Sequence, residues 1–176
     1  MGSFVAPIRL ADVIEAQFLR EHLECALMHE AISRVTEDDR KRLSEILSKQ
    51  KRALEDNDPT QFYEFDEAMH ALFADIAGKP GLWELIRQRK AHLDRVRRIS
   101  LQTPSRMSEI YEQHLRICSG LLNGQEKLAI AELRHHLQGV LKTVERLELT
   151  DNDFELVAPK RKRRTRAEMT ASRSEE

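Results

Sequence analysis

Apolar residues recur every three or four positions through six successive segments of this 176-residue chain, a periodicity that predicts helices and no strand. The predicted helices cover residues 11–34, 37–56, 60–77, 81–101, 105–122 and 125–149. Short breaks with turn-forming residues separate them: Asn57-Asp58-Pro59, Gly78-Lys79-Pro80, Thr103-Pro104-Ser105 and Asn123-Gly124. Because short links make consecutive helices neighbours of opposite direction, the pattern predicts an all-α antiparallel six-helix bundle.

The composition fits one helical domain of this kind. Hydrophobic residues make up 40% of the chain and charged residues 34%, with only 6 Gly and 5 Pro. No apolar run is long enough to cross a bilayer and no signal peptide opens the sequence, so we expect no membrane partner. Cys25 and Cys118 have no CxxC neighbour, which favours reduced thiols and a cytoplasmic protein.

The charge is unevenly distributed. Six of the 29 basic residues form a run from Lys160 to Arg166, which leaves 23 basic residues against 30 acidic ones in the rest of the chain. Residues 151–176 are therefore predicted to be a flexible basic tail, either simply solvated or adding sequence-independent contact to DNA. The acidic remainder is a poor nucleic-acid surface by itself.

Polar residues interrupt the apolar faces of three predicted helices. In the stretch FDEAMHALF, Asp66 and His70 lie one turn apart beside Phe65, Met69 and Phe73. His114 lies in the apolar stripe of the fifth helix, and His136 lies in that of the sixth. Burying such a group without a partner costs several kcal/mol or forces it neutral.

A shared divalent metal would satisfy all four residues at once. Asp66, His70, His114 and His136 are the predicted ligands, and three imidazoles with one carboxylate suit zinc first, and also nickel, manganese or iron. The alternative is that each is a core residue satisfied by hydrogen bonds without metal. The remaining histidines lack this placement and are predicted to lie at the surface: His22, His29, His92 and His135.

Several segments together resemble the FadR C-terminal (FCD) effector-binding domain of GntR-family transcription regulators, in its VanR-like six-helix form. They are FLREHLECAL, FDEAMHALFADIAGKPGLWELI, His114 and ELRHHL, and the resemblance covers residues 10–149. It implies an FCD-like domain over residues 10–150 that binds metal through Asp66, His70, His114 and His136. It also implies that Arg20 faces an effector pocket. Lys79 departs from the family pattern, which often has Asn between the Gly and the Pro.

The first residues carry a second resemblance. The segment MGSFVAP is similar to the end of the wing in the family's winged helix-turn-helix, so residues 1–9 are interpreted as a wing remnant or linker. Operator DNA would then be contacted only through an N-terminal winged helix-turn-helix that this sequence largely lacks. The resemblance further implies a homodimer.

The resulting hypothesis is a ligand-sensing regulator and not an enzyme. A metal with open positions would bind a small carboxylate, a hydroxy acid or a sugar acid, and Arg20 and Arg97 would contact this effector. For Arg20, an ion pair with Glu24 one turn later is an equal alternative. Two rival hypotheses remain open: a metal-dependent enzyme using the same centre, and a metal-free helical dimerisation module.

Overall fold

A computed structural model describes residues 7–150, with side chains to residue 146. It contains seven α-helices in that range and no strand, which confirms the all-α prediction. The predictions for the basic tail and for all but the last three residues of the wing remnant fall outside the described residues. The helices are α1 (Leu10–Ile32), α2 (Glu37–Glu55), α3 (Pro59–Ile76), α4 (Pro80–Arg89), α5 (Ala91–Ser100), α6 (Pro104–Leu122) and α7 (Glu126–Thr150).

One predicted helix is two helices in the structure. The segment 81–101 breaks at Lys90, whose φ of −99° and ψ of 13° end α4 and begin α5. The Lys90 side chain is buried, and its ammonium lies 2.5 Å from Glu67 of α3 and 2.8 Å from Asp94 of α5. No Gly or Pro marks this position, so the six-helix prediction missed the break. The break coincides with an ion pair of the inward-facing Lys90 side chain.

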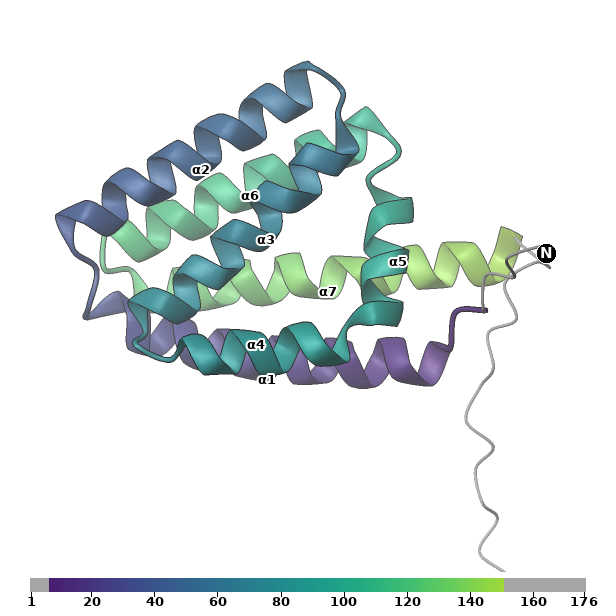
Figure 1. Cartoon of the computed structure of the whole chain (residues 1–176), viewed down its shortest axis with the longest axis horizontal. Helices are drawn as coiled ribbons and strands as arrows, with labels where there is room; N and C mark the ends of the chain where they lie inside the picture. Colours follow the sequence, from purple (N-terminus) through teal and green to yellow (C-terminus); the bar gives the residue numbers. More distant parts are fainter. Residues whose placement is uncertain (1–6, 151–176) are drawn as a thin grey trace, which may run out of the picture.

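The helices pack side by side, and α5 lies toward one end of the bundle (Figure 1). The α2–α3 and α6–α7 pairs pack closely, and α1 lies along α7, α3 and α4. In Figure 1, α5 runs steeply across the bundle, and it packs on α1 and α7. Among the described residues, no helix combines the length and the apolarity that a membrane span needs.

Local signals in the sequence set several helix ends. The Thr36 hydroxyl accepts a hydrogen bond from the Asp39 amide while the Asp39 carboxylate accepts one from the Thr36 amide, a reciprocal cap at the start of α2. At the start of α3, ahead of Pro59, the Asp58 carboxylate accepts hydrogen bonds from the amides of Thr60 and Gln61. Gly78 follows α3 with a φ of +71°, a conformation that glycine adopts without steric cost.

The core consists of three apolar clusters, and α3 passes from one to another. Phe62 and Tyr63 belong to a cluster with residues of α2 and α6, while Met69 and Phe73 belong to the largest cluster, which joins α1, α2, α3, α4, α6 and α7. Asp66 lies between these two sets along α3, and His70 follows Met69 at the start of the second. The fold therefore holds those residues at the junction of two apolar clusters.

We predict that Lys90→Met lowers the free energy of unfolding by about 3 kcal/mol, because the partly buried carboxylates of Glu67 and Asp94 would then share Arg97 as their remaining cation. Arg87→Met is the matched control, since Arg87 is exposed and pairs only with Glu84 nearby on α4; we expect a change within about 0.5 kcal/mol. Urea unfolding followed by circular dichroism measures both. Equal midpoints for the two variants would contradict a structural role for Lys90.

Candidate metal centre

The structure brings together all four residues predicted as metal ligands. Asp66 and His70 come from consecutive turns of α3, His114 from α6 and His136 from α7, and all are buried. One potential ligand atom of each lies within 4.8 Å of those of the other three. The imidazole centroids of His114 and His136 are 4.7 Å apart, and those of His70 and His136 are 5.3 Å apart. This spacing is compatible with one shared ion.

Each of the three imidazoles is held by an oxygen at its Nδ1 atom. Nδ1 of His70 lies 2.5 Å from the Glu24 carboxylate, and Nδ1 of His114 lies 2.7 Å from Oε1 of Gln50. Nδ1 of His136 lies 3.0 Å from Oε1 of Gln113. An oxygen of this kind accepts hydrogen bonds, so each Nδ1 donates a proton and each neutral ring keeps a bare Nε2.

Further contacts fix the orientation of the two glutamine amides. Nε2 of Gln50 donates to the backbone carbonyl of Phe65 at 3.0 Å, which turns Oε1 toward His114. Nε2 of Gln113 donates to Glu109 at 3.4 Å, which turns its Oε1 toward His136. The tautomers of both histidines follow from these contacts. Groups that hold a histidine at one nitrogen and free the other are typical of metal sites.

The free nitrogens face a carboxylate. Nε2 of His114 lies 3.3 Å from Oδ1 of Asp66, and Nε2 of His70 lies 3.8 Å from Oδ2. Neither nitrogen has a hydrogen-bond partner, although both are buried. With the Nδ1 atoms protonated, these contacts place lone pairs against carboxylate oxygens, which is unfavourable unless a cation lies among them. The residues therefore fit a divalent metal.

The protonation states also suit metal binding. Burial lowers the pKa of His114, and burial together with the neighbouring His114 and His70 lowers the pKa of His136 well below its ordinary value. Burial alone would raise the pKa of Asp66, but the Arg97 guanidinium beside it holds that pKa well below its usual range. His114 and His136 thus present neutral imidazoles beside an ionised carboxylate, the forms that bind zinc and related ions.

Arg20 and Arg97 line a small cavity beside this group. The cavity measures about 30 Å³ and is also lined by Asp66 and His136. Nε of Arg20 lies 2.5 Å from Glu24, the ion pair that the sequence analysis gave as the alternative for this residue. Its Nη2 atom, however, is buried and has no hydrogen-bond partner. Arg20 therefore has one donor that is paired with Glu24 and one buried donor that is unused, and its side chain lines the cavity.

Arg97 is more fully engaged with protein groups. Its guanidinium is hydrogen-bonded to Asp66 and lies 2.5 Å from Glu67 and 3.2 Å from Asp94. It also lies over the Tyr63 ring, 4.9 Å from the centroid. Its first role in the structure is to neutralise the carboxylates behind the centre, and contact with a ligand at this residue stays a prediction.

Sequence reasoning missed Glu24, Gln50 and Gln113, the residues that orient the histidines. A signal for them existed, because each is a polar side chain on an otherwise apolar helix face. Gln50 follows Leu43 and Leu47 at helical spacing, and Gln113 lies between Ile110 and Ile117. Periodicity marks such residues as inward-facing but does not show which residue on another helix each one meets.

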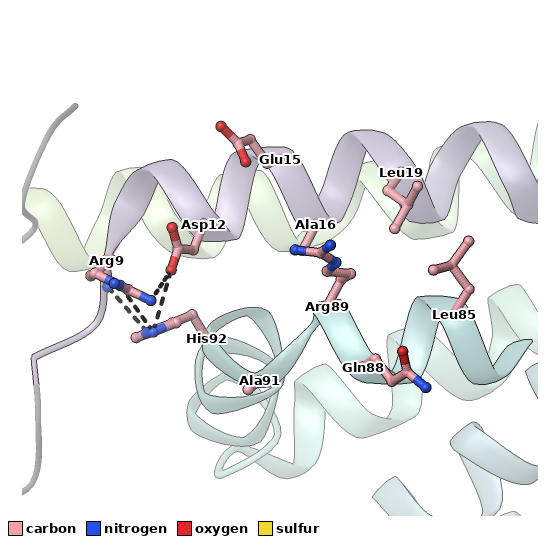
Figure 2. A pocket seen from close by; sticks show the side chains of 10 residues that line it. All are labelled: Arg9, Asp12, Glu15, Ala16, Leu19, Leu85, Gln88, Arg89, Ala91 and His92. Atoms are coloured by element: carbon pink, nitrogen blue, oxygen red, sulfur yellow. Dashed lines mark hydrogen bonds and ion pairs between the residues drawn. The ribbon is translucent and has the colours of Figure 1, made fainter.

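A larger hollow lies elsewhere. Figure 2 shows a surface groove of about 690 Å³ between α1 and the corner of α4 and α5. Three of its lining residues pair with one another, since Arg9 lies 2.5 Å from Asp12 and the backbone amide of Arg9 donates to His92. None of its lining residues lines the cavity beside Asp66. The four-residue centre and its small cavity are therefore the candidate site.

The sequence is similar to those of known transcription regulators. The chain is 31% identical over 153 residues to the HTH-type transcriptional repressor RspR of Escherichia coli K12, covering 87% of this chain and 67% of the repressor. It is also 31% identical over 147 residues to an HTH-type transcriptional regulator in an unstable DNA locus of Streptomyces ambofaciens, covering 84% of this chain and 61% of that protein. Both relatives are named as transcription regulators.

The fold comparison and the family match agree. The solved structure of E. coli McbR/YncC superposes with a TM-score of 0.72 over 81% of this chain and 72% of that one, at 19% identity, which shows a shared fold. The FCD domain family matches residues 15–139, a range that includes all four residues of the candidate metal centre. The chain therefore belongs to the FCD domain family of GntR-type transcription regulators.

Proposed function

We propose that this domain senses a small carboxylate, hydroxy acid or sugar acid at a divalent metal, zinc in the first instance, held by Asp66, His70, His114 and His136. The observation that carries the proposal is the arrangement of the three histidines. Each has its Nδ1 atom held by another side chain, and two have a buried Nε2 without a hydrogen-bond partner. Neutral imidazoles fixed in this way are prepared to bind a metal.

The bound ion would act as a Lewis acid with positions left for the oxygens of an acid. The chain's own contribution to acid binding is cationic. Arg20 lines the cavity together with Asp66 and His136, its buried Nη2 donor is unused, and a guanidinium suits a carboxylate oxygen. Together these features favour an organic acid as the effector.

Control of DNA binding would follow from a change in helix packing. The metal centre joins α3, α6 and α7, while Arg20 belongs to α1 and Arg97 to α5. A ligand touching these residues would favour one relative arrangement of five helices over another. In a dimer, such a change alters the spacing of two attached winged helix-turn-helix modules and hence their fit to operator half-sites.

The homodimer in this proposal would form along α1 and α4. Ile14 and Phe18 lie one turn apart on α1 and are 50% and 64% exposed, and Leu85 on α4 is 41% exposed. Helices α1 and α4 pack on each other, so these side chains belong to neighbouring elements. Exposed apolar side chains on adjacent helices are typical of a protein interface.

Two other functions are less well supported. An enzyme would use the metal to activate water and would need a general base. Glu24 and Glu67 are the neighbouring carboxylates, but Glu24 is held by Arg20 and His70, and Glu67 by Lys90 and Arg97. A metal-free dimerisation module would leave the buried Nε2 atoms of His70 and His114 without partners, which costs free energy.

We predict that the purified protein contains about one divalent metal per chain and that His136→Ala lowers its zinc affinity at least about 100-fold, since a ligand is lost and loss of an orienting residue alone costs 10–100-fold. His135→Ala is the matched control because His135 is the preceding residue and is exposed. Elemental analysis and zinc titration measure both. Equal zinc affinity in the two variants would overturn the metal centre and favour the metal-free module.

We predict that lactate or a similar hydroxy acid raises the melting temperature of the metal-loaded protein and has little effect after chelation. Arg20→Lys should weaken acid binding about tenfold without loss of metal, because the planar fork of donors is lost while the charge remains. Arg134→Lys, an exposed residue paired with Glu21, is the control. Conversion of the acid to a product during incubation would support the enzyme instead.

We predict that Phe18→Glu shifts the protein from dimer to monomer in size-exclusion chromatography with light scattering, because a charge at an apolar interface must be desolvated. Leu128→Glu is the control, since Leu128 is 46% exposed but lies on α7. A dimer that survives Phe18→Glu and is lost with Leu128→Glu would place the interface on α7.

A further inference from the structure

Arg106 at the start of α6 separates two hollows. It lines the small cavity beside Asp66 and His136, and it also lines a surface hollow of about 580 Å³ between the start of α6 and α7. Among the residues that line these hollows, Arg106 is the one that they share. Its side chain therefore forms part of the wall between solvent and the candidate centre.

A glycine on α7 makes room for this side chain. A Cβ atom at Gly139 would lie 2.7 Å from Nη2 of Arg106, closer than real Cβ contacts allow. The guanidinium thus rests directly against the α7 backbone. A side chain at this position would require the end of the Arg106 side chain to shift.

The bonding of Arg106 is incomplete. Nη1 lies 2.7 Å from Glu109, whose side chain is 56% exposed, so this ion pair is weak and readily exchanged. The Nε atom is buried and has no hydrogen-bond partner. Two arginines that line one cavity, Arg20 and Arg106, therefore each have an unused buried donor. Such donors call for an acceptor, and the charge of two guanidinium groups favours an anionic one.

The cavity is too small for an organic acid, so part of its wall would have to move. A volume of about 30 Å³ has room for about one water molecule, so any organic acid needs a wall to be displaced. Leu101, Ile110, Leu137 and Val140 form the apolar wall and are packed in the core. Arg106, by contrast, lies between this cavity and the surface hollow and pairs with an exposed carboxylate, so its displacement would open the cavity to solvent.

We propose that Arg106 gates this cavity and binds a second carboxylate of the ligand, so that the domain prefers dicarboxylic acids to monocarboxylic ones. The inference rests on the proposed function and narrows its ligand class. One carboxylate would lie at the metal and Arg20, and the other would replace Glu109 on Arg106. Closure of Arg106 over the bound acid would then report occupancy to α6 and α7, the helices that it joins.

The test compares two acids that differ by one carboxylate. Calorimetry on the zinc-loaded protein measures the affinity for malate and lactate in the wild type, Arg106→Met, Arg106→Lys and Arg116→Met. Arg116 is the control because it also links α6 to α7, through Glu132, but lines none of the hollows described above. Zinc content and melting temperature verify that each variant is folded and loaded.

We expect the wild type to bind malate at least about tenfold more tightly than lactate, the effect of one charge-assisted hydrogen-bonded pair. Arg106→Met should bring the ratio of malate affinity to lactate affinity to about one, Arg106→Lys should keep part of the preference, and Arg116→Met should keep all of it. A preference for malate unchanged in Arg106→Met, or an equal affinity of the wild type for both acids, would overturn the inference and leave the proposed function standing. Failure of the wild type to bind either acid would overturn both.

Discussion

The burial of a carboxylate and three imidazoles at the meeting point of three helices constrains the rest of this structure. Asp66, His70, His114 and His136 lie where water cannot solvate them, so every polar atom needs a partner from the protein or from a bound ion. The protein supplies partners on the outer side, through Glu24, an amide of α2 and an amide of α6. The Nε2 atoms and the Asp66 carboxylate lie on the inner side and face a common point.

A series of ion pairs extends from this point to the break between α4 and α5. Asp66 is bonded to Arg97, Arg97 to Glu67, and Glu67 to Lys90 at the break between α4 and α5. The alternation of sign allows several charges to be buried together, because each has an opposite neighbour. It also joins the candidate centre to the orientation of α5, so the site and the bundle depend on each other. Such coupling is what a ligand sensor requires.

Few residues line the cavity, and they would determine which ligands the proposed site selects. Apolar side chains of α6 and α7 close most of its wall, and three arginines supply the donors. Two of them pair with buried carboxylates, whereas Arg106 pairs with the exposed Glu109 and lies against the α7 backbone at Gly139. This difference in pairing is the basis for proposing that Arg106 is the residue that moves.

The sequence by itself determined the helical class, most helix ends and the inward direction of Asp66, His70, His114 and His136, because periodicity, caps and turns are properties of neighbouring residues. Only the tertiary structure decided the break at Lys90 and the partners of the histidines. His70 meets a residue 46 positions away and His114 one 64 positions away, pairings that no local pattern encodes. The seating of Arg106 on Gly139 likewise depends on how closely two helices approach, which packing of the whole core sets.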